Sequence, residues 1–356
     1  MRARALGLPL TGRTGPLNAI TDVPGVEVGY TTLIEGDSVR TGVTALLPRG
    51  RNDFAASCAA GWFSLNGNGE MTGTAWLSET GSLRLPVLIT NTHAVGPCHR
   101  GVIDWVRDHR PEVADEWLLP VIAETWDGYL NDINGPHVTA EHAVAAINAA
   151  TSGPVAEGSL GGGTGMNCYG FKGGNGTASR IVEYGRDTYT VAAFTQANFG
   201  SRKELTVCGV PVGEDLADDN PMENWHNAAG AGSVIVVIAT DAPLLPGQCT
   251  ALARRVPLGL ARTGTTGSHF SGDIFLVFST ANKGALNSGF PHGEPGYDQL
   301  RCIPWNRMDD FYAATVHAVE EAVLNVLAAS TTMTGRAGHR SPGVPLDRLL
   351  TLVNRG

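Results

Sequence analysis

The sequence predicts an α/β protein in which stacked β-sheets are flanked by helices. Three observations predict this class: strand-like apolar runs recur, helical patterns alternate with them, and glycine is abundant. The 356-residue chain has 46 glycines without a collagen-like period and 42% hydrophobic residues. Such glycine use is typical of tight turns and close backbone approaches, and the hydrophobic content suffices for a packed core. No linker, low-complexity tract or fixed-period repeat divides the chain, so we expect a single domain over residues 1–356.

Four runs rich in β-branched residues, each bounded by Gly, Pro or Asn, predict strands at 85–93, 189–199, 232–243 and 272–282. The central runs are apolar almost throughout, so we expect both of their faces to be covered.

Three segments predict helices. Residues 139–151 are Ala-rich, with Thr139 as a candidate N-cap. Residues 245–263 read as a helix that fails near Pro257. The clearest helix is 309–331, where the apolar residues at helical spacing form a stripe and Glu320 and Glu321 are expected to face away from it.

Charge and cysteine usage narrow the function classes. The net charge is −9, only 17% of residues are charged, and Lys and Arg do not cluster, which argues against nucleic-acid and anionic-membrane binding. The six cysteines are scattered without a C-x-x-C pair, so we expect free thiols in a reducing compartment. The N-terminal apolar stretch is broken by Gly, Pro and Thr, and no long apolar run follows, so a cytoplasmic location is expected.

Ser271 stands immediately before the predicted strand 272–282, after the pliable loop "RTGTTGSHF". A serine hydroxyl needs a base to become a nucleophile, and the chain has no G-x-S-x-G elbow. If the bond before Ser271 were cut through an N→O acyl shift, the new α-amino group, with a pKa of about 7.7–8.0, could serve as that base. A plain turn-to-strand junction is the competing interpretation.

The segment 156–180 is very rich in glycine. Its backbone N–H groups could converge on an anion or oxyanion, with Gly162 and Gly163 as candidates, or the glycines could serve a crowded backbone crossing. No phosphate-loop signature is complete here.

Acidic and histidine residues gather in two other stretches. Asp127 and Asp132 in "ETWDGYLNDINGPHV" are interpreted as caps and Asx-turns. The histidines of "NTHAVGPCH" and "PHVTAEH" lack metal-ligand spacing and are interpreted as structural.

Ten motifs occur in an order that resembles one family, from about residue 13 to the C-terminus: "LNAITDVPGVEVGY", "GNGEMTGTAW", "TNTHAVG", "WDGYLNDINGPHV", "EGSLGGGTGM…YGFKGGNGTASR", "QANFG", "GVPVG", "ATDAPLLPGQ", "ARTG" and "SGDIF…FSTAN". Together they resemble the DmpA-type L-aminopeptidase/D-esterase and β-peptidyl aminopeptidase family. The resemblance implies a four-layer αββα sandwich of the DmpA/ornithine acetyltransferase type, similar in layout to N-terminal-nucleophile hydrolases. It implies no metal or organic cofactor.

The resemblance also implies a precursor that cuts itself between Phe270 and Ser271 into chains 1–270 and 271–356. Glu157 falls at the position expected to meet the substrate's free amino group, and Tyr169 matches a tyrosine near the nucleophile. Asn198 in "QANFG" is the candidate oxyanion donor, with the Gly-rich backbone as its rival. Trp126, Tyr129 and Trp305 are candidate pocket walls.

Two residues depart from the family pattern. Phe270 replaces the usual Gly or Asn before the nucleophile, and its bulk could hinder the acyl shift or move the cut to the Gly267–Ser268 bond. In an ungapped placement, Pro304 and Asn306 stand where the family has a Ser-x-Glu pair that supports the amine of the nucleophile, so Asn306 is the candidate substitute.

The sequence thus predicts a self-processing serine aminopeptidase that acts on small peptides or amino-acid amides and esters through an acyl-enzyme. Asp273 is expected to order the turn beside Ser271, with a catalytic role as the alternative. The alternatives are an acyltransferase on the same scaffold and a non-catalytic small-molecule binder. The resemblance and the low charge favour a homo-oligomer, a tetramer of α/β heterodimers.

Overall fold

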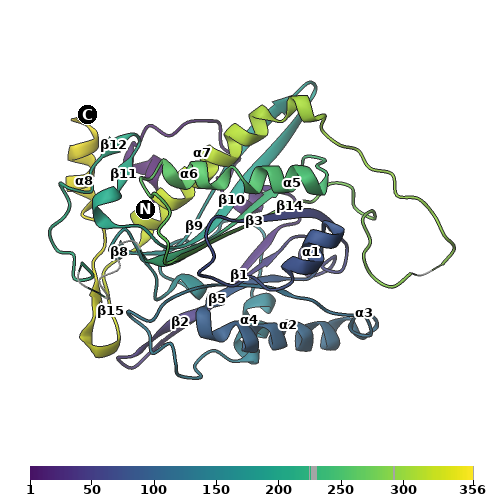
Figure 1. The fold of residues 1–356 in the computed structure, drawn as a ribbon, viewed down its shortest axis with the longest axis horizontal. Helices are drawn as coiled ribbons and strands as arrows, with labels where there is room; N and C mark the ends of the chain where they lie inside the picture. The colour runs from purple at the N-terminus through teal and green to yellow at the C-terminus, as the bar shows by residue number, and fades with distance from the viewer. Residues whose placement is uncertain (224, 226–230, 292, 356) are drawn as a thin grey trace.

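The computed structural model describes residues 1–223, 225, 231–291 and 293–355. Two β-sheets lie face to face, and helices cover the outer face of each, as Figure 1 shows. The predicted αββα order of layers is confirmed. A core of Val, Ile, Leu and Phe side chains from both sheets fills the space between them.

The larger sheet has the strand order β4-β3-β14-β13-β10-β9. Only β13 and β14 run parallel within it. Its strands are β4 (Ser82–Leu83), β3 (Cys58–Ser64), β14 (Ser271–Ser279), β13 (Gly232–Thr240), β10 (Asp187–Asn198) and β9 (Gly174–Tyr184).

The smaller sheet has the order β1-β2-β5-β6, with β5 and β6 parallel. Its strands are β1 (Glu27–Glu35), β2 (Val39–Leu47), β5 (Val87–Asn91) and β6 (Val121–Thr125). Two-stranded ribbons complete the β-structure: β7 (Asn167–Cys168) with β8 (Phe171–Lys172), β11 (Thr206–Val207) with β12 (Val210–Pro211), and β15 (Met333–Thr334) with β16 (Arg340–Ser341).

The four predicted strands correspond to β5, β10, β13 and β14. Every described residue of β14 is buried, because the helical layer covers one face of the larger sheet and the second sheet covers the other. Continuous apolar runs therefore mark the strands that have no solvent-facing side.

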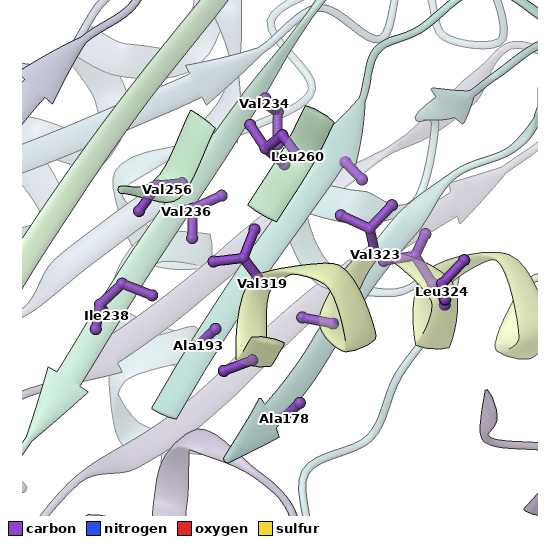
Figure 2. Close-up of a cluster of buried hydrophobic side chains, with 14 of the residues drawn as sticks. Ala178, Ala193, Val234, Val236, Ile238, Val256, Leu260, Val319, Val323 and Leu324 are labelled. Atoms are coloured by element: carbon purple, nitrogen blue, oxygen red, sulfur yellow. The ribbon is translucent and has the colours of Figure 1, made fainter. Parts of the chain in front are cut away.

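The helices of the outer layers pack on opposite sides. α2 (Val95–His109) and α4 (Ala140–Asn148) cover the smaller sheet through a core that includes Trp105. On the larger sheet, α5 (Pro246–Ala253), α6 (Val256–Ala261) and α7 (Asp309–Ala329) form the outer layer. Figure 2 shows valines and leucines of α6 and α7 against Ala178, Ala193 and the valines of β13. The remaining helices are α1 (Thr74–Thr80), α3 (Pro111–Ala114) and α8 (Leu346–Val353).

Two helix predictions need correction. The segment 245–263 does break, but at Arg254–Arg255, and Pro257 lies in the first turn of α6, where its missing N–H is not needed. Glu320 and Glu321 do not face solvent. They are 3% and 0% exposed, because α6 and the N-terminal segment cover that face of α7 and supply their partners.

The N-terminal segment is fixed by a buried ion cluster. The Glu321 carboxylate accepts hydrogen bonds from the Arg180 guanidinium at 2.7 Å and from Arg4 at 2.9 Å. Arg262 of the α6 end pairs with Glu320 at 2.5 Å. These contacts join residues far apart in sequence, so no local pattern could reveal them.

All six cysteines are free thiols, as expected. Four are buried, Cys208 is half-buried and Cys302 is exposed. No described helix is both long and apolar enough to cross a membrane.

Candidate active site

A cavity of about 600 Å³ opens at the end of the larger sheet where β13 and β14 begin. Its wall includes Gly232, Ser233 and Phe270 from these strand starts and Asn198 from the end of β10. The strand register places Ser233 between Asn198 and Gly272, so three adjacent strands bring these residues to one edge.

Ser271 begins β14 at this edge and is 1% exposed in the intact chain. Its hydroxyl donates a hydrogen bond to Asp273 Oδ1 at 2.5 Å. Residues i and i+2 of a strand point to the same face, which explains why these two side chains meet across Gly272. Asp273 therefore does more than order a turn, because it contacts the oxygen that the sequence predicts to be the nucleophile.

Phe270, the residue before Ser271, is 58% exposed and lines the cavity. Its carbonyl oxygen accepts two hydrogen bonds, from Gly232 N–H at 3.1 Å and from the Asn68 side-chain amide at 3.2 Å. The bulky ring points away from the packed core, so it occupies space that a smaller residue would leave open.

Asn198 lies in the cavity wall with its amide group fixed on both sides. Its Oδ1 accepts from the Asn167 N–H at 2.8 Å, and its Nδ2 donates to the Trp126 carbonyl at 2.8 Å. An amide Nδ2 carries two protons, so one remains for a substrate oxygen. Trp126 also lines the cavity, and its backbone N–H donates to Ser233 Oγ at 3.0 Å.

Glu124 is a cavity residue to which the sequence interpretation gave no role. It is the penultimate residue of β6, is 2% exposed, and accepts hydrogen bonds from Glu70 N–H at 2.8 Å and from the Thr92 hydroxyl. Burial raises the pKa of its carboxyl above the ordinary range, although these two bonds oppose the shift. A Cβ on Gly69 would lie 3.3 Å from Glu124 Oε1 and 2.8 Å from Gly272 Cα, so this carboxylate is close to the start of β14.

Glu157 is placed elsewhere. Its Oε2 pairs with Arg2 Nε at 2.8 Å, and its Oε1 accepts from Thr177 N–H at 2.9 Å, under the N-terminal segment. The described lining of the cavity does not include Glu157.

Gly162 and Gly163 lie in a buried 3₁₀ turn between the sheets. A Cβ on Gly162 would stand 2.3 Å from Gln196 Oε1, and one on Gly163 would stand 2.8 Å from Asn175 N. Their N–H groups already donate to Thr44 Oγ1 and to the Leu160 carbonyl. This geometry is that of the crowded backbone crossing, and it does not point these N–H groups into the cavity.

Neither Tyr169 nor Asn306 contacts Ser271. The Tyr169 hydroxyl lies 2.7 Å from Thr263 Oγ1 and accepts from Thr265 N–H at 3.1 Å, so it fixes the start of the loop that leads to Phe270. Asn306 is exposed at the opposite end of the sheet, where nearby Ile303 pairs with Pro243 beyond the end of β13. The length of a nine-residue strand puts it about 25–30 Å from Ser271.

Of the three candidate wall residues, Trp126 lines the cavity, whereas Tyr129 and Trp305 are not among its described lining residues. Tyr129 is buried behind the cavity, stacked on His339 with ring centroids 4.7 Å apart. Trp305 is 56% exposed beside Asn306.

Asn66, Asn68 and Glu124 are the site residues that sequence reasoning missed. Asn68 stands within the motif "GNGEMTGTAW" and Asn66 directly before it, but nothing local assigns them a role. Glu124 closes the apolar run "VIAE", and an acid at the end of a buried strand was the available signal.

Asp127, Asp132, His137 and His142 have side-chain partners within the fold. Asp127 Oδ1 accepts from Asn131 Nδ2 at 3.0 Å, and Asp132 Oδ2 lies 3.1 Å from His137 Nε2. Among the described residues, no group of three or more His, Cys, Asp or Glu side chains is arranged to hold a metal ion.

Comparison with known proteins identifies close relatives over the whole chain. The profile of peptidase family S58 matches residues 18–341. The β-peptidyl aminopeptidase BapA of Sphingosinicella microcystinivorans is 47% identical over 372 aligned positions, covering 99% of this chain and 92% of the relative.

Two solved structures share the fold at a similar level. The L-aminopeptidase D-Ala-esterase/amidase of Ochrobactrum anthropi, described as a prototype for the serine aminopeptidases and a variant of the Ntn hydrolase fold, is 44% identical with a TM-score of 0.93, covering 99% of this chain and 98% of its own. A β-aminopeptidase from a Burkholderia species is 43% identical with a TM-score of 0.92, covering 100% of this chain and 99% of its own.

Proposed function

The chain belongs to peptidase family S58 and is a self-processing serine aminopeptidase, and we propose that it matures by cutting its own Phe270–Ser271 bond. The observation that carries the proposal is the position of Ser271, which starts a fully buried strand directly after Phe270 of the cavity wall. Cleavage there converts a buried internal serine into a chain terminus anchored by the ladder of β14.

In the mature enzyme, the Ser271 hydroxyl attacks the carbonyl carbon of the substrate's N-terminal residue. The new α-amino group of Ser271 accepts the hydroxyl proton and later returns it to the leaving group. The second N–H of the Asn198 side-chain amide donates a hydrogen bond to the oxyanion and stabilises it by about 3–4 kcal/mol, as expected for one good donor. Water then hydrolyses the acyl-enzyme.

The Glu124 carboxylate receives the substrate's ammonium group. Glu124 is buried in the cavity wall close to the start of β14, whereas Glu157 is already paired with Arg2. A fixed carboxylate in the cavity wall selects substrates with a free N-terminus, so the enzyme removes residues from the N-terminal end of a peptide.

The substrates are small peptides and amino-acid amides or esters, including those with N-terminal β-amino acids. The relatedness to a β-peptidyl aminopeptidase at 47% identity supports this range.

The maturation test is intact-mass measurement of freshly prepared protein. We expect two fragments of about 28 and about 9 kDa, in proportion to their lengths, from a chain of 37.3 kDa. S271A should remain whole and inactive. S268A, which removes the only other serine of the turn, should be processed normally. A mass that places the cut at Gly267–Ser268 would move the nucleophile to Ser268 and contradict the assignment.

The activity test compares amino-acid p-nitroanilides with their N-acetylated forms. Processed protein should release nitroaniline from the free-amine substrates only, because an acetyl group removes the positive charge and adds bulk at Glu124. Equal turnover of both forms would contradict the exopeptidase assignment.

We also propose that the processed chains form a homo-oligomer in the cytoplasm, a tetramer of α/β heterodimers. The low fraction of charged residues and the exposed pair of Trp117 and Phe290, with ring centroids 5.6 Å apart, support association. Light scattering after gel filtration tests the assembly, and a monomeric mass would refute it.

A further inference from the structure

The Ser271–Asp273 contact exists in the uncut chain, before any terminal amine is available. The Ser271 hydroxyl donates to Asp273 Oδ1 at 2.5 Å, and both residues are nearly inaccessible to solvent, at 1% and 2% exposure. The self-cleavage step needs a base for the same hydroxyl, and the amine that serves the mature enzyme is still locked in the peptide bond. Asp273 is the group in contact with the proton that must leave.

Asn66 holds the Asp273 carboxylate in place. Its Nδ2 donates to Asp273 Oδ2 at 2.9 Å and to the Ser268 carbonyl at 3.0 Å, while its Oδ1 accepts the Asp273 N–H at 2.7 Å. The oxygen that faces Ser271 is therefore distinct from the oxygen that Asn66 fixes. Burial raises the pKa of Asp273 above the ordinary range, against the opposing effect of these hydrogen bonds, which moves it toward the working pH of a general base.

The carbonyl of the bond to be cut is also prepared for attack. Phe270 O accepts from the Gly232 N–H at 3.1 Å and from Asn68 Nδ2 at 3.2 Å. Two donors on one carbonyl oxygen stabilise the negative charge that develops when a nucleophile adds to the carbon. Ser271 N–H donates to the Ser268 carbonyl at 3.1 Å, which holds the turn closed around this bond.

We propose that Asp273 is the general base of the self-cleavage reaction and that Asn68 and Gly232 form its oxyanion hole. The inference rests on the proposed cut before Ser271. It assigns the maturation step a set of groups separate from those of peptide hydrolysis.

The chemistry balances without any further reactant except water. Ser271 Oγ forms a bond to the Phe270 carbonyl carbon, its proton passes to Asp273 Oδ1, and the carbonyl electrons move onto the oxygen held by Asn68 and Gly232. Collapse of this intermediate breaks the bond to Ser271 N, which takes the proton back from Asp273. The resulting ester is hydrolysed by water to a Phe270 carboxylate and a free Ser271 hydroxyl.

The test follows self-cleavage of pulse-labelled full-length chains in cell-free translation. D273N keeps the shape of the side chain and removes the base, so its cleavage rate should fall about 10²- to 10⁴-fold. N68A should slow the same step about 10²- to 10³-fold. D241N is the matched control: Asp241 is a partly buried carboxylate just after β13 at the far end of the sheet, accepting Thr190 N–H at 2.7 Å, and its loss should leave the rate unchanged.

D273E separates a base from a structural support. Glutamate keeps the charge but not the length, whereas asparagine keeps the length but not the charge. A base predicts that D273E cleaves faster than D273N, and a purely structural role predicts the reverse order. The unmodified chain should also cleave more slowly as the pH falls through the raised pKa of Asp273, and D273N should lose this dependence.

The outcomes are distinct. An unmodified chain that stays whole overturns the proposed maturation and this inference with it. Cleavage of folded D273N at the unmodified rate, while S271A stays whole, overturns the inference alone. If circular dichroism shows that D273N has lost its fold, the pH profile decides, and a rate that is flat between about pH 4 and pH 8 refutes the role of Asp273.

Discussion

Replacing Glu124 by glutamine should weaken recognition of the substrate's ammonium group without disturbing the cavity. Glutamine has the same length, its oxygen can still accept the Glu70 N–H, and its amide can donate to the Thr92 hydroxyl, which can rotate. What is lost is the negative charge. A hydrogen bond to a charged group contributes about 1.5–3 kcal/mol. At about 1.4 kcal/mol per factor of ten, kcat/KM for a free-amine substrate should fall about 10- to 150-fold.

The assay measures kcat/KM of processed E124Q for an amino-acid p-nitroanilide and for its analogue without the amino group. The first should fall and the second should not, because the analogue makes no contact with the lost charge. E157Q is the matched control. Glu157 pairs with Arg2 at 2.8 Å outside the described cavity lining, so its loss should leave kcat/KM within about twofold. A large loss in E157Q with none in E124Q would refute the reasoning and return the role to Glu157.

The pH dependence of the same reaction gives a second check on Glu124. The ammonium group is bound by the ionised carboxylate, and burial raises the pKa of this carboxyl above the ordinary range. The contribution is therefore present above that raised pKa and is lost as the pH falls through it. The acid limb of kcat/KM should lie at higher pH than an exposed glutamate would give, and E124Q should lack this limb.

Two further substitutions test packing. G162A should lower the free energy of unfolding by about 1–3 kcal/mol in denaturant titration, because a Cβ would stand 2.3 Å from Gln196 Oε1. The variant that does fold should keep its kcat. A large loss of kcat at unchanged stability would restore Gly162 as an oxyanion donor. E321Q should lower the free energy of unfolding by about 3–5 kcal/mol, because it leaves the buried Arg180 without its charge partner. E183Q is the control: its ion pair is mostly solvent-exposed, so the same measurement should fall by less than about 1 kcal/mol. Equal losses in the two variants would contradict the role of the buried cluster.

The parts of the fold that the sequence reveals are those set by local patterns. The runs that became β13 and β14 are apolar at nearly every position, because both faces of these strands are covered. The stripe of α7 is equally visible, and Phe311, Val319 and Val323 are buried as expected. The error at Glu320 and Glu321 has a different origin. A charged residue on a helix is normally solvated, and only the fold shows that arginines from distant segments reach these two.

The part of the site that the sequence predicts is likewise the part set by a local pattern. Ser271 is conspicuous because a polar turn meets a buried strand, and Asp273 is visible because it is two residues away on that strand. Asn66 and Asn68 come from the loop after β3, whereas Glu124 comes from β6 of the other sheet, so only the three-dimensional arrangement assembles them.

Glycine density could not separate an anion-binding loop from a packing crossing, since both need a backbone without side chains. At Asn306, a residue-by-residue placement fails for a physical reason. β14 itself carries the chain from Ser271 to the opposite end of the sheet, and the residues just before α7 stay at that end, where Ile303 N–H donates to the Pro243 carbonyl at 2.9 Å.

The position of Phe270 connects maturation with substrate binding. Its carbonyl is held by Asn68 and Gly232, and all three residues line the cavity that the substrate will occupy. Before the proposed cut, the chain's own Phe270 therefore lies in the cavity wall next to Ser271, and it is 58% exposed. In the maturation that we propose, hydrolysis of the ester leaves a negatively charged carboxylate at Phe270, in the same cavity wall as Asn68 and Glu124. We expect repulsion between this carboxylate and Glu124 to favour withdrawal of the freed end, which would open the place that the next acyl group must take.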